Sequence, residues 1–145
     1  MRPALTAAAT LVAAALLRSA HASPQQDYIL YCMGCHGAQA QGVAGKVPPL
    51  AGSVALFMRS PEGRNYVLRV PGAANSALGD AQLAAVLNWL AERFPPADPD
   101  APKGTPFTAA EVSELRRTPL ADVRDRRREV VRALAASGPA PPADY

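Results

Sequence analysis

The sequence has few of the residues that would support a disulfide framework or a membrane protein. Its 145 residues include two cysteines, Cys32 and Cys35, and two histidines, His21 and His36. A small exported domain held by disulfides would need several cysteine pairs, so this class is excluded. The one long apolar run, Ala4 to Leu17, is shorter than the roughly 18 residues that a transmembrane helix needs. No segment alternates apolar and polar residues in the manner of a strand, and an all-α fold is expected.

The first 22 residues have the pattern of a secretory signal peptide. Arg2 precedes the apolar run, and Ala20-His21-Ala22 has the small residues of a cleavage site. We therefore expect cleavage after Ala22, export to the periplasm and no membrane span in the mature chain. Without Arg2 and Arg18, 13 basic residues face 12 acidic ones, so charge gives no reason to expect binding to nucleic acid.

Prolines divide the remaining chain into segments of different composition. The stretch from Phe94 to Pro102 contains four prolines, which cannot continue a helix. We expect a folded domain over residues 23–94, a proline-rich linker over 95–107, a helical extension over 108–137 and a disordered tail over 138–145. The extension is charge-rich, so we expect it to be a solvated helical appendage of the domain.

Helix signals occur on both sides of the linker. Ser23 and Ser60, each followed by proline, predict short helices that run into the Cys32 region and to about Arg69, where Pro71-Gly72 ends the second. Asp80 is expected to cap the clearest helix, Asp80 to Arg93, whose apolar residues lie on one face. In the extension, Thr108 and Asp122 are expected to open two further helices. Residues 37–53 are expected to form a loop.

The chemistry of the chain is indicated by Cys32-Met33-Gly34-Cys35-His36, the CxxCH attachment motif of a c-type haem. Two thiols three positions apart on a helical turn can each form a thioether with one haem vinyl group, and His36 then lies under the iron as proximal ligand. A thioredoxin-like disulfide would need a βαβ context that is missing here. A zinc site would need four ligands, and cleavage after Ala22 leaves His36 as the one histidine beside the two cysteines.

With this motif, the chain resembles a small monohaem class I c-type cytochrome. The resemblance covers residues 23–94 and includes Pro48-Pro49-Leu50-Ala51-Gly52, which matches a PxLxG stretch of the family. It implies a cytochrome c-like fold of three to four short helices around one covalent haem. It also implies that the Pro48 carbonyl accepts a hydrogen bond from His36. The last helix is expected to cross the first helix, with Trp89 as the aromatic residue at the crossing. The C-terminal extension lies outside the resemblance.

The sixth iron ligand is where the sequence departs from the family. Members usually bind the distal face through a methionine just before the last helix, and residues 70–79 contain none. Met33 lies within the attachment turn, on the proximal side, which leaves Met58 as the candidate sulfur ligand. Core packing is the competing role for Met58. Asn75, Lys46, water and an empty position remain open alternatives.

These observations predict a periplasmic electron carrier that is not an enzyme. Its expected partners are redox proteins, namely a dehydrogenase donor and an oxidase or cytochrome acceptor. An open distal position would instead favour binding of small ligands or peroxide, and the extension could dock the chain into a larger dehydrogenase. Five residues around the predicted middle helix could bind the haem propionates, although an ordinary solvated face is the simpler interpretation: Arg59, Arg64, Asn65, Tyr66 and Arg69.

Overall fold

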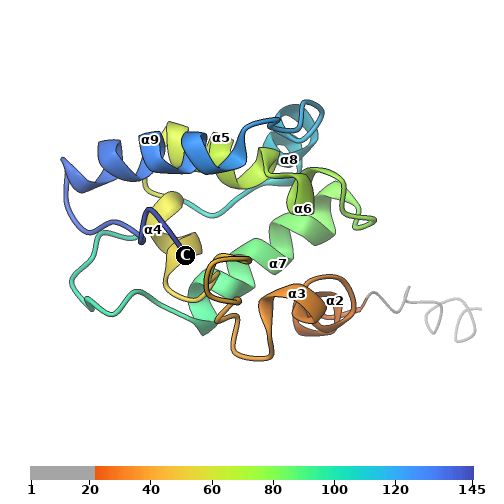
Figure 1. The fold of residues 1–145 in the computed structure, drawn as a ribbon. Coiled ribbons are helices and arrows are strands. Elements are labelled where there is room, and N and C mark those ends of the chain that lie inside the picture. The colour runs from red at the N-terminus through yellow and green to blue at the C-terminus, as the bar shows by residue number, and fades with distance from the viewer. Residues whose placement is uncertain (1–21) are drawn as a thin grey trace, which may run out of the picture.

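A computed structural model describes residues 22–145, so the predicted signal peptide lies outside the described residues except for Ala22. The fold is all-α, as predicted (Figure 1). Between residues 22 and 145 the only β-type pairing is an isolated bridge between Val43 and Val47. The helices are α2 (Pro24–Tyr31), α3 (Met33–His36), α4 (Ser53–Phe57), α5 (Pro61–Arg69), α6 (Pro71–Ala74), α7 (Asp80–Arg93), α8 (Ala109–Leu115) and α9 (Val123–Ala135).

Local capping accounts for most of the helix starts. The Ser23 hydroxyl accepts from the Gln26 amide at 3.3 Å, and the Gln26 side chain accepts from the Ser23 amide at 2.8 Å. Ser60, Thr108 and Asp122 cap α5, α8 and α9 as predicted. The prediction for α7 is wrong by one residue, because Gly79 is the N-cap. Asp80 is already helical there, so its carboxylate instead pairs with Arg116 at 3.2 Å.

Two short helices, α4 and α6, are not predicted by the sequence. Gly52, with a φ of 69°, precedes α4 and offers no side-chain cap, so the sequence contains no start signal there. Pro71-Gly72 is predicted to end a helix. In the structure the break falls at Val70, whose ψ is 138°, and Pro71 begins the new turn α6. A proline is compatible with the first turn of a helix because it needs no amide donor there.

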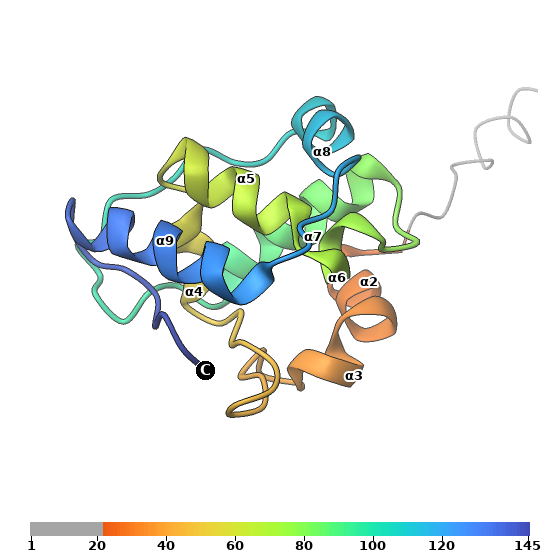
Figure 2. The ribbon, with the colours of Figure 1, turned by 45° about the horizontal axis from the view of Figure 1, so that its top comes forward.

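Helices α2 and α7 cross through their aromatic residues. The rings of Tyr28 and Trp89 lie 5.5 Å apart, which confirms the predicted role of Trp89. The Tyr28 hydroxyl donates to the Gly37 carbonyl at 2.6 Å and ties α2 to the loop after α3. Tyr31 remains 52% exposed, so it does not pack on α7 as Tyr28 does. In both views α2 and α3 lie on one side of α7, and α5 and α9 lie on the other (Figures 1 and 2).

The extension contributes to the same hydrophobic core as α4, α5 and α7. Helix α8 packs on α7, and α9 packs along α5 (Figure 2). The Asn88 side chain makes two hydrogen bonds with the backbone of Phe107, at 2.8 and 3.0 Å. Five side chains from residue 107 onwards are less than 9% exposed and belong to the hydrophobic core: Phe107, Val112, Val130, Val131 and Leu134. The extension predicted to be a solvated appendage therefore buries one face against the domain.

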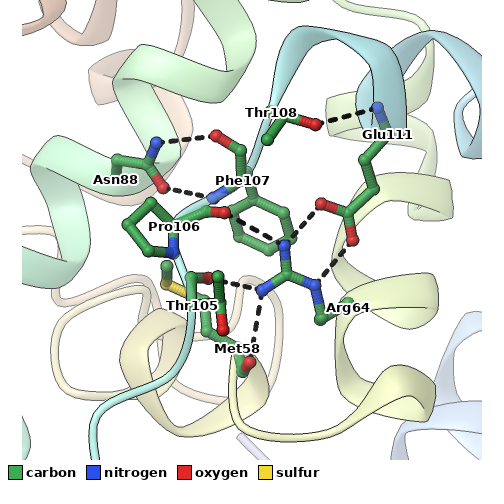
Figure 3. Close-up of polar contacts among 8 residues, drawn as sticks. All are labelled: Met58, Arg64, Asn88, Thr105, Pro106, Phe107, Thr108 and Glu111. Carbon is green, nitrogen blue, oxygen red and sulfur yellow. Dashed lines mark hydrogen bonds and ion pairs between the residues drawn. The ribbon is translucent and has the colours of Figure 1, made fainter.

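Arg64 anchors the segment that leads into α8 (Figure 3). Its guanidinium pairs with the Glu111 carboxylate and donates to the carbonyls of Met58, Thr105 and Pro106. It also lies 4.4 Å above the centre of the Phe107 ring. This single side chain joins α4, α5 and the start of α8.

Two other arginines of the middle helix region also bind the extension. Arg69 donates to the Thr118 carbonyl at 2.7 Å, and Arg59 donates to the Pro139 carbonyl at 2.6 Å. Three of the five side chains considered as propionate ligands, Arg59, Arg64 and Arg69, therefore hold the chain beyond Phe107. The last residues, 138–145, which the sequence predicts to be disordered, make further contacts with α9, including an ion pair between Arg128 and Asp144 at 3.0 Å.

Candidate haem site

A cavity of about 340 Å³ lies between α3 and the group formed by α5 and α9. Apolar side chains from α4, α5 and α7 form most of its wall, including Val54, Phe57 and Leu87. Cys32, Cys35 and His36 line the cavity at its α2–α3 end. Cofactor sites in proteins commonly measure roughly 300–1,000 Å³ and combine apolar walls with a few polar groups.

The motif residues lie on a single helical turn. The His36 amide donates to the Cys32 carbonyl at 3.0 Å, which closes the turn and holds both cysteines on it. The two form no disulfide with each other, and Cys32 is half-buried whereas Cys35 is exposed. Burial raises the pKa of the Cys32 thiol, and the charges of Asp27 and Cys35 raise it further. Before the haem is attached, the Cys32 thiol therefore stays protonated to higher pH than a free cysteine.

The imidazole of His36 is oriented by a backbone carbonyl. Its Nδ1 lies 3.0 Å from the Pro48 oxygen. Because a carbonyl oxygen can only accept, Nδ1 carries the proton and Nε2 presents a lone pair. Burial lowers the pKa of His36, and the bond to Pro48 opposes this change. The neutral ring is the form that binds a metal ion.

Gly42 keeps the Pro48 carbonyl in place. Its φ is 70°, and a Cβ at this position would lie 2.3 Å from the Val47 oxygen and 2.7 Å from the Pro48 oxygen. Its amide also donates to the His36 carbonyl at 2.8 Å. A side chain here would push away the oxygen that orients His36.

We therefore expect Gly42→Ala to lower the stability by about 2 kcal/mol or more, since the clash adds to the strain of a left-handed backbone. The check is a denaturant unfolding curve together with the ferrous spectrum. Gly45→Ala is the matched control, because Gly45 has a φ of 73° and no heavy atom lies within 4 Å of the position that its Cβ would take. Equal losses in the two variants would show that backbone strain alone matters and that Pro48 is unaffected.

Met58 lies outside this cavity. Helix α4 presents Val54 and Phe57 to the cavity, whereas Ala55 and Met58 face a different hollow formed with α7 and the proline-rich segment. Gly104 packs directly on Met58, since a Cβ at Gly104 would lie 2.5 Å from the Met58 Cβ. Figure 3 shows that the Met58 carbonyl accepts a hydrogen bond from Arg64. Met58 is 6% exposed and packs in the core. The structure brings Cys32, Cys35, His36 and Pro48 together but does not bring Met58 to them.

Comparison with known proteins decides the family. No family model matches the chain. It is 38% identical over 104 residues to a cytochrome c-552 of Thermus thermophilus, a match that covers 59% of this chain and 78% of that protein. A second cytochrome c-552, from a culture-collection strain of the same species, is also 38% identical over 104 residues, which cover 69% of its length. This chain is a monohaem c-type cytochrome.

Its cofactor is accordingly one covalently bound haem c with its iron, and its class is that of electron carriers. The cavity fits this group, because apolar walls suit the porphyrin and two cysteines, an imidazole and the buried Arg127 side chain all line it. None of the helices described between residues 22 and 145 has the length and apolar character needed to cross a bilayer.

The distal side of the cytochrome lacks the ligands common in its family. Among the described residues that line the cavity there is no methionine and no histidine besides His36. Of the alternatives, Lys46 lines the cavity and Asn75 does not. The wall formed by Val70 and Pro71 is apolar. The described lining of the cavity therefore contains no thioether that could bind an iron together with His36.

Arg127 is a cavity residue that the sequence alone does not identify. This side chain is 2% exposed and lines the cavity together with Tyr66 and Tyr145. Burial raises the pKa of Tyr66, while a hydrogen bond and the charge of Arg127 oppose the change, so Tyr66 is a neutral phenol. The signal was present in the spacing of α9, where position 127 falls on the same face as Val123, Val130, Val131 and Leu134.

Proposed function

We propose that Cys32 and Cys35 form the two thioether bonds to the haem and that His36 is the proximal iron ligand. The observation that carries this proposal is the 3.0 Å contact between His36 Nδ1 and the Pro48 oxygen, on the wall of a cavity that both cysteines share. The Pro48 carbonyl fixes the tautomer and orientation of the ring and increases its basicity as a ligand. The apolar walls from α4, α5 and α7 exclude water from the cofactor.

The cytochrome would act as a periplasmic carrier of single electrons between redox proteins. Haem c supplies the one-electron iron couple. The chain holds the cofactor and limits the structural change around it when an electron is gained or lost. A dehydrogenase is the proposed donor, and an oxidase or another cytochrome is the proposed acceptor. Export is supported by the leader pattern up to Ala22 and by the covalent mode of haem attachment that CxxCH indicates.

The placement of Met58 favours a second candidate function. Without a methionine at the cavity, the distal position would be open or weakly bound, and a small neutral ligand or peroxide could reach the iron. This would make the protein a ligand-binding or peroxidase-like cytochrome, in addition to or instead of an electron carrier.

Optical spectra of Met58→Leu separate these candidates. Since Met58 faces the hollow behind α4, the ferric and ferrous spectra of this variant should match those of the wild type. The wild-type ferric protein should lack the weak long-wavelength band of methionine ligation and should bind cyanide within seconds to minutes. Met33→Leu is the control for loss of a methionine on the proximal side.

Two results would contradict these expectations. A wild-type methionine band that disappears in Met58→Leu would show that Met58 reaches the iron, and would favour the closed electron carrier. A purified protein without covalently bound haem would contradict the assignment of Cys32, Cys35 and His36 altogether.

A further inference from the structure

Arg127 is a buried charge without an ionic partner in the described part of the chain. Its Nε donates to the Pro142 carbonyl at 3.1 Å, and its guanidinium lies 5.2 Å from the centre of the Phe57 ring. Nη2 is buried and has no hydrogen-bond partner within residues 22–145. No carboxylate in this range forms an ion pair with Arg127.

The two arginines next to Arg127 in sequence both form ion pairs, so the lack of a carboxylate partner is particular to Arg127. Arg126 pairs with Glu129 at 2.9 Å, and Arg128 pairs with Asp125 at 3.0 Å, both on the exposed face of α9. Of these three arginines, Arg127 on the buried face of α9 is the one without a carboxylate partner. A buried charge without compensation is strongly destabilising, so its counter-charge is expected to come from outside the polypeptide.

The required anion must be present in the resting protein and must lie in the cavity. The described lining contains no aspartate or glutamate, and its cationic side chains besides His36 are Lys46 and Arg127. The haem of this cytochrome carries two propionate carboxylates that are always present. A guanidinium matches a carboxylate through parallel N–H donors. An external ligand, by contrast, would leave the charge unpaired whenever it is absent.

We propose that Arg127 binds a propionate carboxylate of the haem through Nη2. The proposal rests on the placement of the haem in this cavity. It makes α9, which belongs to the C-terminal extension, a component of the cofactor site. The positive charge beside the haem stabilises the ferrous form relative to the ferric form, because reduction lowers the positive charge of the iron centre.

The reduction potential of Arg127→Gln tests this role. Removing the charge should shift the one-electron equilibrium roughly tenfold towards the ferric form, which corresponds to about 59 mV for a one-electron couple. Arg126→Gln is the matched control, since it removes the same charge from the exposed face of the same helix and should leave the potential unchanged. The resonance Raman propionate bending band should move in Arg127→Gln and Arg127→Lys but not in the control.

A measurement on the wild-type protein covers the case in which Arg127→Gln fails to fold. In the ferrous carbon monoxide complex, which is diamagnetic whatever ligand the wild-type iron binds, nuclear Overhauser contacts should join the Arg127 guanidinium protons to the propionate methylene groups of the haem. Absence of these contacts, or an unchanged potential and Raman band in Arg127→Gln, would overturn the proposal while leaving haem attachment at Cys32 and Cys35 intact.

A third outcome identifies a different anion. If Arg127→Gln kept the wild-type Raman band but bound cyanide or fluoride at least tenfold more weakly, the Arg127 side chain would stabilise an anion bound to the iron. The propionate proposal would then be wrong. Equal anion affinities in the wild type and Arg127→Gln, together with the shifted potential, are the expected result.

Discussion

Replacing Cys32 and Cys35 together by alanine should yield a protein without covalent haem and with most of its helical structure lost. The haem is expected to fill the cavity of about 340 Å³, and without it the apolar side chains of α4, α5 and α7 that line the cavity would face water. Burial of each such side chain contributes about 1.5–3 kcal/mol, so the loss of several is comparable to the whole free energy of unfolding of a typical domain, about 5–15 kcal/mol. The loss of the haem would also leave Arg127 buried without an anion.

Two measurements check this result. Acidified organic solvent should extract any remaining haem from the double variant but none from the wild type, and far-ultraviolet circular dichroism should report the loss of helix. Met33→Leu, a change on the same turn that keeps both thiols, should retain haem and helix. A double variant with wild-type helicity and haem that resists extraction would disprove attachment at these positions.

The parts of the fold that depend on local sequence are predicted well. Helix starts at Ser23, Ser60, Thr108 and Asp122 follow from side chains that bond to amides within the next three residues. The long helix α7 follows from an apolar face repeated at helical spacing. These interactions lie within one or two turns of chain, so a single sequence contains the information that determines them.

The placement of side chains relative to one another is harder to predict. Met58 is a candidate ligand because the sequence offers no better sulfur, but the side of α4 on which it lies depends on how α4 packs between α5 and α7. Arg64 and Arg69 are candidate propionate ligands because they cluster around the predicted middle helix and because a guanidinium suits paired carboxylates. In the structure they bond to Glu111 and to Thr118, residues more than forty positions away.

The composition of residues 124–132 does not indicate that Arg127 is buried. The stretch from Arg124 to Arg132 contains both charge signs, which is typical of a solvated helix. Only the pattern of Val123, Val130 and Leu134 indicates which arginine faces inwards. Burial, rather than the number of arginines, identifies the residue with a functional role.

Deleting residues 98–145 should prevent the protein from forming a stable haem-bound fold, contrary to the expectation from sequence that the extension is a solvated appendage. The deletion removes Phe107, Val112, Val130, Val131 and Leu134 from the core. Each buried apolar side chain contributes about 1.5–3 kcal/mol, so the loss is of the same order as the total stability. The deletion also leaves Arg64 without Glu111 and Asn88 without Phe107.

A shorter deletion provides the control. Removing residues 138–145 takes away the Pro139 and Pro142 carbonyls and Tyr145 but keeps every buried side chain of α8 and α9. This protein should retain haem and unfold at a lower denaturant concentration than the wild type. The longer deletion should give little soluble protein with a ferrous cytochrome spectrum. If it instead kept the wild-type spectrum and midpoint, the extension would be an independent appendage, and Arg127 could not be required at the haem.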